Sequence, residues 1–560
     1  MNFTGADLLI HLLEQQGVRT VAGIPGGALL PLYDALGRCT SIRHILARHE
    51  QSAGFIAQGM ARLTGRAGVC FATSGPGVTN IITAVADAKL DSIPLICISG
   101  QVPQHLIGTD AFQEVPTLDM VRPVTKASYF IRDASELVSV IPQAFHLAQS
   151  GRPGPVWIDV PKDVQMQPVR FTAARDALTA AQPDPVITAP QPELFDQAWQ
   201  LIVRAERPVL YVGGGVVKAR AHHLLRELAE LIHTPVTTTL MALGALPTDH
   251  PLSLGMLGMH AARYTNQALD ECDLLIAIGA RFDDRATGKP ERFTPHAQVI
   301  HIDIDPREFG KIRRPTLAIA SDARAALCEL LARAHYQRRE AWFQRVNALR
   351  ASAPLRTPAI DEICSPYGIV RAVGELAPAD VIVTTDVGQH QMWVAQAFPF
   401  RRPDRWLTSG GLGTMGFGVP AAIGAALAQP DATVICFTGD GSLLMNIQEL
   451  ATLAELDLNV KILVLDNGAL GLVRQQQTLF YRRQLVASQF AQASNFVAIA
   501  RAFGVPALDL ESDTAPYSTL SRALSEPGPA LIRVPIAADD HVLPMVAPGA
   551  ANIEALDHSA

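Results

Sequence analysis

Residues 434–467 read VICFTGDGSLLMNIQELATLAELDLNVKILVLDN. Two apolar, β-branched runs stand at the ends of this stretch, and a helical pattern of leucines and alanines lies between them. A strand, a glycine turn, a helix and a second strand in this order are typical of a parallel sheet with helices on both faces. The turn is Gly439-Asp440-Gly441-Ser442, and Asn467 follows 28 positions after Gly439, where the second strand ends.

The turn and the asparagine predict a site for Mg²⁺ and a diphosphate. Mg²⁺ prefers octahedral oxygen ligands, commonly one or two protein groups completed by phosphate oxygens and water. The Asp440 carboxylate and the Asn467 amide oxygen would lie at one edge of the sheet, where open α/β sheets bind ligands. Gly439 and Gly441 allow close backbone approach, and the following helix N-terminus favours the diphosphate charge. An ordinary strand-to-helix turn is the alternative, and the asparagine at this distance favours the metal site.

The same alternation of short apolar runs and longer helical patterns extends through the whole chain. It predicts an α/β protein built from three doubly wound parallel-sheet domains. Two proline-containing stretches, 166–194 and 351–366, are the predicted linkers. The predicted units are an N-terminal domain at 1–165, a central domain at 195–340, a C-terminal domain at 367–537 and a tail at 538–560.

Residues 69–100, VCFATSGPGVTNIITAVADAKLDSIPLICISG, repeat the plan of residues 434–467. Both stretches contain a strand, a glycine turn, a helix that opens near Asn-Ile and a second apolar strand. Two explanations stay open. The similarity can arise by chance between two α/β units, or the first and third domains are related and flank a different central one.

Composition and charge narrow the class of protein. The chain has 560 residues, of which 48% are hydrophobic and 18% charged, and its net charge is −7. The charges form no blocks of one sign, so we expect no nucleic-acid partner. No apolar run approaches the ~18 residues that cross a bilayer, and the start of the chain lacks a secretion signal. The seven cysteines are scattered without CxxC spacing, so we expect reduced thiols and a cytoplasmic location without a membrane partner.

The GDG turn and its distant asparagine resemble the signature of the thiamine-diphosphate enzyme superfamily, in which Asn-Asn or a variant follows GDG. This chain has Asp466-Asn467, a departure at the first position. The resemblance implies that Asp440, Asn467 and the backbone carbonyl of Ala469 bind Mg²⁺ against the diphosphate. The other residues that it assigns to thiamine diphosphate, besides the Glu50 discussed next, are Gln389, His390, Gly413, Met415, Gly441 and Ser442.

Thiamine chemistry needs an acidic side chain. The cofactor's own 4′-amino group removes the thiazolium C2 proton once a carboxylic acid holds the aminopyrimidine in its imino form. Glu50 stands in ARHEQSAGFIAQGMAR, residues 47–62, directly before a helical pattern of small residues. A glutamate there can also be a first-turn charge that complements the helix dipole. RHEQ resembles the family pattern and favours the activating role. In relatives the two halves of each site come from different subunits, which implies a homodimer.

Motifs along nearly the whole chain resemble one family of this superfamily, acetohydroxyacid synthase, also called acetolactate synthase. They are GIPGGALLPLYDAL (23–36), TSGPGVTN (73–80), GTDAFQE (108–114), SGRPGPVWIDVPKDVQ (150–165), LGMLGMH (254–260), GARFDDRATGK (279–289), DVGQHQMW (386–393), SGGLGTMGFGVPAAIGA (409–425) and VLPMVAPGA (542–550). The resemblance implies a catalytic large subunit that decarboxylates pyruvate and joins the two-carbon unit to a second 2-keto acid. Pyruvate as acceptor gives 2-acetolactate and 2-ketobutyrate gives 2-aceto-2-hydroxybutyrate, the first common step of branched-chain amino-acid biosynthesis. A small regulatory subunit is a further implied partner.

The resemblance also assigns residues near the reacting groups. The Gly27 backbone N–H would lie near the substrate oxygen, as an oxyanion donor does. Gln113 would be the neighbouring polar group and Phe112 part of the wall. Met415 resembles the wedge that bends the cofactor, although a methionine in such a sequence, taken alone, is more often a core residue.

The central domain is expected to bind FAD. Residues 208–215, PVLYVGGG, end a strand in three glycines, and residues 299–305, VIHIDID, end another in acids that can reach a ribose. This is not the GxGxxG fingerprint, so the pattern alone is weak, and the resemblance to FAD-containing synthases carries the prediction. In that family FAD undergoes no net redox change. The residues assigned to FAD are Arg152, Gly214, Thr239, Leu240, Met259, His260, Gly279, Arg281, Asp283, Asp303, Ile304 and Asp322.

Two residues bear on the second keto acid. Arg285 suits bidentate binding of its carboxylate, and a surface ion pair with Asp283 or Asp284 is the alternative. Most relatives have a tryptophan nine residues after the metal-binding asparagine, which favours 2-ketobutyrate, whereas this chain has Gln476. Losing that apolar contact should remove about 1–3 kcal/mol of discrimination for one methylene. The departure resembles the bacterial isozyme I subgroup and predicts weak acceptor preference.

Three rival functions stay open at this point. A flavin-dependent pyruvate oxidase uses the same two cofactors, and a plain 2-keto acid decarboxylase would release aldehyde. A catalytically silent cofactor-binding subunit is the third, and the presence of Glu50, Asp440 and Asn467 together argues against it.

Overall fold

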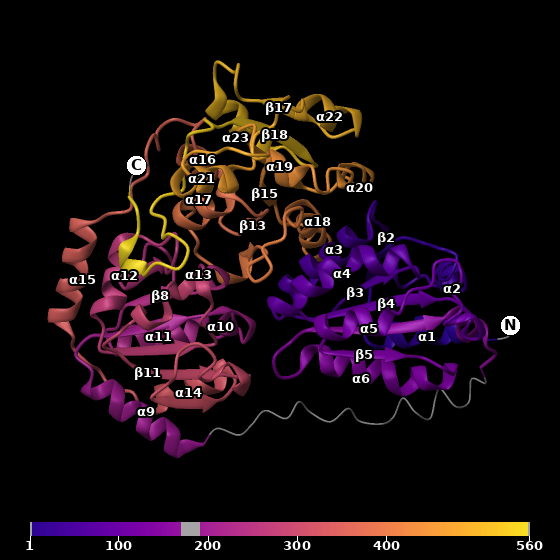
Figure 1. The fold of residues 1–560 in the computed structure, drawn as a ribbon, viewed down its shortest axis with the longest axis horizontal. Helices are drawn as coiled ribbons and strands as arrows, with labels where there is room; N and C mark the ends of the chain where they lie inside the picture. Colours follow the sequence, from indigo (N-terminus) through magenta and orange to yellow (C-terminus); the bar gives the residue numbers. More distant parts are fainter. Residues whose placement is uncertain (1–2, 170–190, 558–560) are drawn as a thin grey trace.

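The computed structural model describes residues 3–169 and 191–557 (Figure 1). These residues form three six-stranded sheets with interleaved helices, and the neighbouring strands of each sheet run parallel. The predicted fold class, three doubly wound α/β domains, is therefore confirmed. The strand sequences explain this, because their largely apolar runs are buried on both faces, as in β4 (Leu95–Gln101), β7 (Pro208–Val212) and β16 (Val460–Asp466).

The N-terminal sheet has the strand order β2-β1-β3-β4-β6-β5. Its strands are β1 (Thr20–Gly23), β2 (Arg43–Leu46), β3 (Gly68–Ala72), β4 (Leu95–Gln101), β5 (Ala127–Phe130) and β6 (Pro155–Pro161). Its helices are α1 (Gly5–Gln15), α2 (Leu30–Arg38), α3 (Glu50–Thr64), α4 (Pro76–Leu90), α5 (Thr117–Val121), α6 (Leu137–Gln149) and α7 (Lys162–Met166).

The central sheet has the order β12-β11-β10-β7-β8-β9. Its strands are β7 (Pro208–Val212), β8 (Val236–Thr238), β9 (Ser253–Met256), β10 (Leu274–Ile278), β11 (Gln298–Asp303) and β12 (Leu317–Ala320). Its helices are α9 (Pro192–Arg204), α10 (Gly214–Lys218), α11 (His222–Leu231), α12 (Arg263–Glu271), α13 (Asp284–Thr287), α14 (Ala323–Arg333) and α15 (Glu340–Ser352). Counted from its own first strand, this is the order 3-2-1-4-5-6 in reverse, which is that of dinucleotide-binding folds.

The C-terminal sheet has the order β14-β13-β15-β16-β18-β17. Its strands are β13 (Ile382–Thr385), β14 (Trp406–Leu407), β15 (Val434–Gly439), β16 (Val460–Asp466), β17 (Ala507–Asp509) and β18 (Ala530–Pro535). Its helices are α16 (Pro366–Leu376), α17 (Gln389–Ala397), α18 (Gly418–Ala428), α19 (Asp440–Leu443), α20 (Glu449–Leu456), α21 (Gly471–Phe480), α22 (Phe496–Ala502) and α23 (Pro516–Ser525). The short 3-10 helices of the three domains and the tail lie at Gln104–Leu106, Arg122–Val124, Ala134–Glu136, Leu240–Ala242, Pro290–Arg292, Pro306–Glu308, Pro403–Arg405 and Asn552–Glu554.

The first and third sheets share one topology. Counted from its own first strand, each has the order 2-1-3-4-6-5. The two similar sequence stretches occupy equivalent places, β3-α4-β4 and β15-α19-α20-β16. This agreement supports related first and third domains over chance similarity.

Helices α3 and α18 join the N-terminal and C-terminal domains within the chain. A Cβ on Gly59 would lie 2.3 Å from the Ala421 carbonyl oxygen, and one on Gly424 would lie 2.0 Å from the Ile56 oxygen. The glycines therefore let the two helix backbones touch. This crossing fixes how the two domains are placed relative to each other.

The C-terminal tail is packed on the central domain, beside α12 and α13 (Figure 1). The Val546 N–H donates to the Met259 oxygen at 3.0 Å, and Asn552 Nδ2 donates to the Ala286 oxygen at 2.8 Å. The tail thus bridges the C-terminal domain, from which it emerges, and the central one.

The two predicted linkers are residues 166–194 and 351–366. Most of 166–194 lies outside the described residues, and α7 overlaps its start. Residues 353–365 contain no helix or strand. The domain limits given above stay predictions. Among the described residues, no helix is both long and apolar enough to cross a bilayer.

Candidate active site and cofactor cavities

A cavity of about 170 Å³, here called the C-terminal cavity, lies at the carboxyl ends of β13, β15 and β16. Strands β13 and β15 are neighbours from which the chain winds in opposite directions, the place where open α/β sheets bind ligands. Every residue that the sequence assigned to thiamine diphosphate, apart from Glu50, lines this cavity. They are Gln389, His390, Gly413, Met415, Asp440, Gly441, Ser442, Asn467 and Ala469.

The three predicted metal ligands meet in one corner of this cavity. Asp440 Oδ1 accepts from the Gly441 N–H at 2.8 Å and Oδ2 from the Ala469 N–H at 3.0 Å. Asn467 Oδ1 accepts from the same Ala469 N–H at 3.2 Å. No group of three or more His, Cys, Asp or Glu suited to a metal occurs in the described parts of the chain. One carboxylate with amide and carbonyl oxygens instead fits Mg²⁺, which keeps few protein ligands beside phosphate oxygens.

The electrostatics of Asp440 fit a cation. Burial raises the pKa of Asp440 to about 7, and the nearby charge of Asp466 acts in the same direction. The charged form of a buried carboxylate is unfavourable unless a cation or hydrogen bonds offset it. Asp466 itself is held by the Arg533 guanidinium, whose Nε lies 2.6 Å from Asp466 Oδ2. The departure from Asn-Asn therefore comes with its own counter-charge.

The cavity also fits a diphosphate. His390 Nε2 is buried and has no hydrogen-bond partner among the described residues, so a polar atom of a bound ligand would satisfy it. Burial lowers the pKa of His390 to about 3, and the ring is neutral at physiological pH. A Cβ on Gly439 would lie 2.9 Å from the His390 ring. Gln389 accepts from Asn467 Nδ2 at 3.0 Å and donates to the Asp540 oxygen of the tail at 2.8 Å.

The predicted residues of the N-terminal domain gather at the carboxyl edge of its own sheet. Glu50 begins α3, and its Oε2 accepts from Asn80 Nδ2 at 2.9 Å. Gly27 is exposed, and Phe112 is 88% exposed. Gln113 has a φ of 61°, and a Cβ on Gly75 would lie 2.9 Å from its backbone. In the described structure, none of the four predicted residues lines the C-terminal cavity of its own chain.

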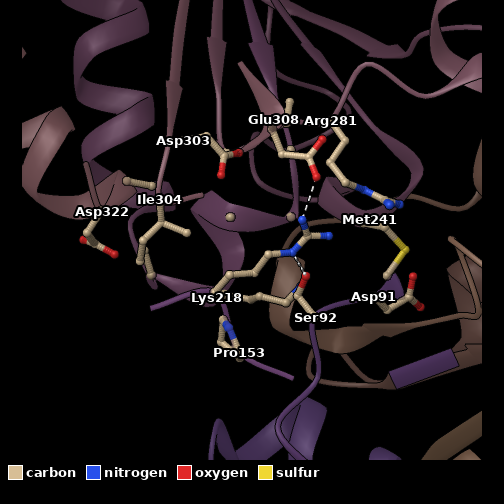
Figure 2. Close-up of a pocket in the computed structure, with 18 of the residues that line it drawn as sticks. Asp91, Ser92, Pro153, Lys218, Met241, Arg281, Asp303, Ile304, Glu308 and Asp322 are labelled. Atoms are coloured by element: carbon tan, nitrogen blue, oxygen red, sulfur yellow. Dashed lines mark hydrogen bonds and ion pairs between the residues drawn. The ribbon is translucent and has the colours of Figure 1, made fainter. Parts of the chain in front are cut away.

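A second cavity, of about 250 Å³ and here called the central cavity, lies between the ends of β7 and β10 (Figure 2). These strands are the switch point of the 3-2-1-4-5-6 order, where dinucleotides bind. The glycine turns after the two strands touch, because a Cβ on Gly213 would lie 2.1 Å from the Gly279 oxygen. Thr239 Oγ1 is buried at this cavity without a partner in the part of the chain that is described. The site therefore fits a dinucleotide such as FAD.

Most residues assigned to FAD line the central cavity, and three do not. Those that do are Arg152, Gly214, Thr239, Gly279, Arg281, Asp283, Asp303, Ile304 and Asp322. Leu240 accepts from Trp406 Nε1 at 2.9 Å. Met259 accepts from the tail, and His260 Nδ1 lies 3.1 Å from the Pro544 oxygen of the tail. These three residues hold the tail and the C-terminal domain, and their assignment to FAD stays a prediction.

Charged residues that the sequence did not predict also line the central cavity. Glu308 accepts from Arg152 at 2.6 Å, and Ser92 Oγ accepts from Arg152 Nε at 2.9 Å (Figure 2). Asp91 is buried beside them. Lys218 lines the same cavity with an exposed side chain, and the protein atoms packed around it lower its pKa to about 8 by desolvation. Asp91 and Ser92 enter from the N-terminal domain, so no local pattern announces them. Lys218 could have been predicted from the sequence, because it is a basic residue four positions after Gly214, in the helical segment that follows the glycine turn.

The two residues expected at the second keto acid lie outside both cavities. Arg285 is exposed on α13, with NH1 3.8 Å from Asp284 Oδ2 and 3.9 Å from Met259 Sδ. The exposed ion pair with Asp284 is thus present, and a carboxylate role for Arg285 stays a prediction. Gln476 is half-buried on α21, outside the lining of the C-terminal cavity.

Comparison with known proteins now identifies the class. Residues 3–120, 195–330 and 386–534 match family models described as the N-terminal TPP binding domain, the central domain and the C-terminal TPP binding domain of thiamine pyrophosphate enzymes. The C-terminal cavity lies within the third match. The central cavity lies mainly in the second, and residues 90–92 of the first match and residues 149–153 also line it. The fold and site are those of a thiamine-pyrophosphate (thiamine-diphosphate) enzyme.

Individual relatives narrow the class to a family. The acetolactate synthase isozyme 1 large subunit of Escherichia coli is 56% identical over 99% of this chain and 97% of its own. The isozyme 2 large subunit is 46% identical over 99% of both chains. The rice chloroplastic acetolactate synthase 1 is 44% identical over 98% of this chain and 87% of its own. The chain belongs to the family of acetolactate synthase large subunits. These names favour the predicted activity over the pyruvate oxidase alternative, and Mg²⁺ and FAD are the usual further cofactors of the family.

Proposed function

We propose that the protein decarboxylates pyruvate and joins the two-carbon unit to a second 2-keto acid, giving 2-acetolactate from two pyruvates or 2-aceto-2-hydroxybutyrate from pyruvate and 2-ketobutyrate. The observation that carries the proposal is the corner formed by Asp440, Asn467 and Ala469 in a chain 56% identical to an acetolactate synthase large subunit. We also propose, as a partner, the small subunit that the relatives' names imply. For this chain we propose a cytoplasmic location and the domain limits 1–165, 195–340 and 367–537.

The residues of the C-terminal cavity would hold and shape the cofactor. When bound, thiamine diphosphate supplies the nucleophilic carbon and the electron sink for decarboxylation. Asp440, Asn467 and the Ala469 carbonyl would bind Mg²⁺, and through it the diphosphate. His390 would contact the bound cofactor through its unpaired Nε2. Met415, which lines the cavity after a glycine-rich segment, would support the bent conformation of the cofactor.

The residues of the N-terminal edge would act on protons and on the substrate. Glu50 would exchange a proton with the aminopyrimidine ring, and Asn80 would hold its carboxyl group in place. The exposed Gly27 N–H would donate to the substrate oxygen. Gln113 would add a polar contact at the same edge, and Phe112 an apolar wall.

A homodimer would bring these two groups of residues together. Glu50 does not line the C-terminal cavity of its own chain, yet the proposed chemistry requires both. Apolar side chains beside that cavity are exposed, namely Met445 at 53% and Val473 at 48%. A second copy that places its N-terminal edge over them would bury this apolar surface and complete the site.

The identity of the product tests the proposed function. The protein is incubated with pyruvate, thiamine diphosphate, Mg²⁺ and FAD, and the product is identified by NMR. Acetolactate is expected, with no net reduction of the flavin. Acetaldehyde as the main product would indicate a simple decarboxylase. Acetate with rapid bleaching of the flavin would indicate an oxidase, and either result would overturn the proposal.

Gln476 is proposed to weaken the preference between the two acceptors. We expect the Gln476→Trp variant to favour 2-ketobutyrate over pyruvate about 10-fold or more compared with the parent, because a large apolar contact discriminates one methylene by this order. The ratio of the two products in a competition experiment measures it. Gln476→Asn, which stays polar, is the matched control and should leave the ratio unchanged. An equal ratio in all three proteins would show that this position does not select the acceptor.

A further inference from the structure

A buried ionic cluster connects the N-terminal domain to the chain segment that lies between the two cavities. It consists of Arg62 on α3, Asp87 on α4 and Asp91 directly after α4, whose side chains are all at most 6% exposed. Arg62 donates to Asp91 at 2.8 Å and to Asp87 at 3.3 Å. Its guanidinium also lies 5.0 Å from the centre of the Phe417 ring in the C-terminal domain.

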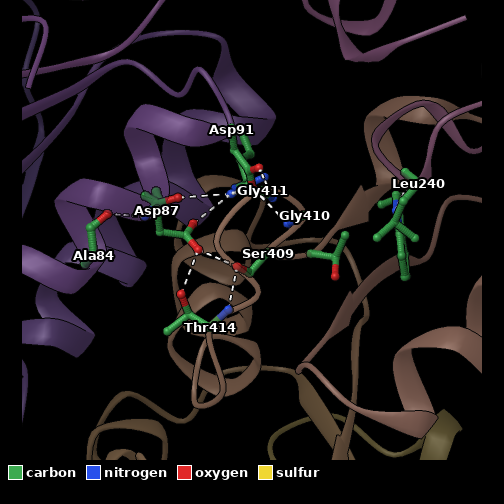
Figure 3. A network of polar contacts seen from close by, with 12 residues as sticks. Ala84, Asp87, Asp91, Leu240, Ser409, Gly410, Gly411 and Thr414 are labelled. Atoms are coloured by element: carbon green, nitrogen blue, oxygen red, sulfur yellow. Dashed lines mark hydrogen bonds and ion pairs between the residues drawn. The ribbon is translucent and has the colours of Figure 1, made fainter. Parts of the chain in front are cut away.

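The two carboxylates hold the segment Ser409–Thr414 (Figure 3). Asp91 accepts from the backbone N–H groups of Gly410 at 3.1 Å and Gly411 at 2.7 Å. Asp87 Oδ2 accepts from the Ser409 hydroxyl and from the Thr414 hydroxyl, the latter at 3.0 Å. The Thr414 N–H donates in turn to Ser409 Oγ at 2.9 Å, which closes the loop on itself.

One end of this segment reaches the central cavity. Asp91 lines that cavity (Figure 2). A Cβ on Gly410 would lie 2.2 Å from Met241 Sδ, and one on Gly411 would lie 3.2 Å from an Arg281 nitrogen. Met241 and Arg281 are both lining residues of the central cavity. A ligand that displaces either side chain therefore pushes directly on the glycines that Asp91 holds.

The other end reaches the C-terminal cavity. Gly413 and Met415 line it. Met415 stands between two anchored neighbours, because Thr414 is held by Asp87 and the Gly416 N–H donates to Asp386 at 2.7 Å. The position of the Met415 backbone thus depends on Asp87, the carboxylate that holds Thr414 and is itself bonded to Arg62.

The cluster restrains the segment because its charges are buried. One guanidinium faces two carboxylates, so the remaining acceptor capacity must be satisfied by the donors of the segment. Moving the segment would leave buried carboxylate oxygens without partners, which is strongly unfavourable. A shift of the segment would therefore cost its hydrogen bonds to both Asp87 and Asp91.

We propose that Asp87 and Asp91 are positioning residues that couple the two cavities, so that a dinucleotide bound in the central cavity strengthens thiamine diphosphate binding in the other. By thermodynamic linkage, thiamine diphosphate with Mg²⁺ then strengthens dinucleotide binding by the same factor. The proposal rests on the cofactors of the proposed function but needs no keto acid. A product other than acetolactate would overturn the proposed function and leave this coupling unaffected.

The test measures FAD binding to the full-length apoenzyme, with and without saturating thiamine diphosphate and Mg²⁺, through flavin fluorescence. In the parent protein we expect the FAD dissociation constant to fall by about 5-fold to 150-fold when thiamine diphosphate is present. In the Ser409→Ala/Thr414→Val double variant we expect this factor to approach one. Neither residue lines the central or the C-terminal cavity of the described structure, so a loss of coupling would not come from a lost contact with a ligand in either one.

Matched variants separate coupling from general stability. Thr414→Ser keeps the hydroxyl that donates to Asp87 and should retain the parent's coupling factor, whereas Thr414→Val alone should reduce it. Asp159→Asn alters another buried carboxyl group of the N-terminal domain, bonded to Ser99 at 2.6 Å and outside both cavities, and should leave the factor unchanged. Light scattering verifies that all the proteins have the same oligomeric state.

Two results would overturn the proposal. One is a parent protein whose FAD affinity does not respond to thiamine diphosphate. The other is a Thr414→Val variant that is folded by circular dichroism and keeps the parent's coupling factor within twofold. If the double variant does not fold, the comparison of Thr414→Val with Thr414→Ser decides the question.

Discussion

Replacing Glu50 by glutamine is expected to lower kcat by about 10²-fold to 10⁴-fold, the usual contribution of a positioned acid or base. Glutamine has the same length and still offers an oxygen to Asn80, which donates to Glu50 Oε2 at 2.9 Å. It cannot give or take the proton that the aminopyrimidine ring requires. Activity with pyruvate, together with the exchange rate of the cofactor's C2 proton followed by NMR, measures the effect.

Glu449→Gln provides a control for the Glu50 experiment. Glu449 is a buried carboxyl group that accepts from the Arg48 N–H at 2.9 Å, two residues before Glu50, and it lines neither cavity. We expect this variant to keep most of the parent's activity. A Glu50→Gln variant that also keeps more than about a tenth of the parent's activity would have lost less than a general acid or base contributes. Glu50 would then not be the activating acid.

Replacing Asp440 by asparagine is expected to weaken Mg²⁺ binding by at least about 100-fold, since even substitutions around metal ligands cost 10-fold to 100-fold. The variant loses the anionic oxygen, and its amide nitrogen would face either the Gly441 or the Ala469 N–H that Asp440 now accepts from. A titration with Mg²⁺ at saturating thiamine diphosphate measures the loss. Tryptophan fluorescence is a suitable signal because Trp393 lines the same cavity.

Asp466→Asn is the matched control for Asp440. It removes a neighbouring carboxylate that is paired with Arg533 at 2.6 Å, and it restores the Asn-Asn pair of the superfamily. We expect the Asp466→Asn variant to bind Mg²⁺ with an affinity within about 10-fold of the parent's. That is the smallest loss usually seen when a residue next to a metal ligand is replaced. Should Asp440→Asn bind Mg²⁺ as tightly as Asp466→Asn, the proposed metal corner is wrong.

Mixing the two inactive proteins tests the homodimer directly. A dimer of one Glu50→Gln chain and one Asp440→Asn chain would contain one site with both residues intact if each site uses Glu50 of one chain and Asp440 of the other. Random exchange of subunits should then restore about a quarter of the parent's activity, since half of the dimers are mixed and each has one intact site of two. No recovery after confirmed exchange would place both residues in the same chain's site.

Much of the C-terminal cavity could be predicted from the sequence because its residues lie within one or two strand-helix units. The spacing between Asp440 and Asn467 fixes both at the carboxyl ends of adjacent parallel strands, β15 and β16. The glycine turns after β7 and β10 were equally readable, since each directly follows its strand. In such units, the spacing between two residues along the chain predicts how close they lie at the sheet edge, because each strand leads into the next through one helix.

Other features depended on how the domains pack. The sequence assigned Leu240, Met259 and His260 to FAD, which stays a prediction, but it did not show that all three also contact the tail or the C-terminal domain. It gave no sign that Asp91 would enter the central cavity from another domain. These contacts join positions far apart in the chain, and their geometry follows from interfaces rather than from local periodicity.

The sequence by itself determined the three parallel-sheet domains, the family and the meeting of Asp440 with Asn467 at one sheet edge, because hydrophobic period, glycine turns and short spacings act within single units. Only the tertiary structure decided what lies between those units. The contact of α3 with α18, where Gly59 and Gly424 let two backbones meet, brings Asp87 to Ser409 across 322 positions of sequence. It also leaves Glu50 outside the cavity of its own chain. At such interfaces, side-chain volumes and buried charges from two domains together select one arrangement. The pattern of a single helix or strand therefore does not predict it.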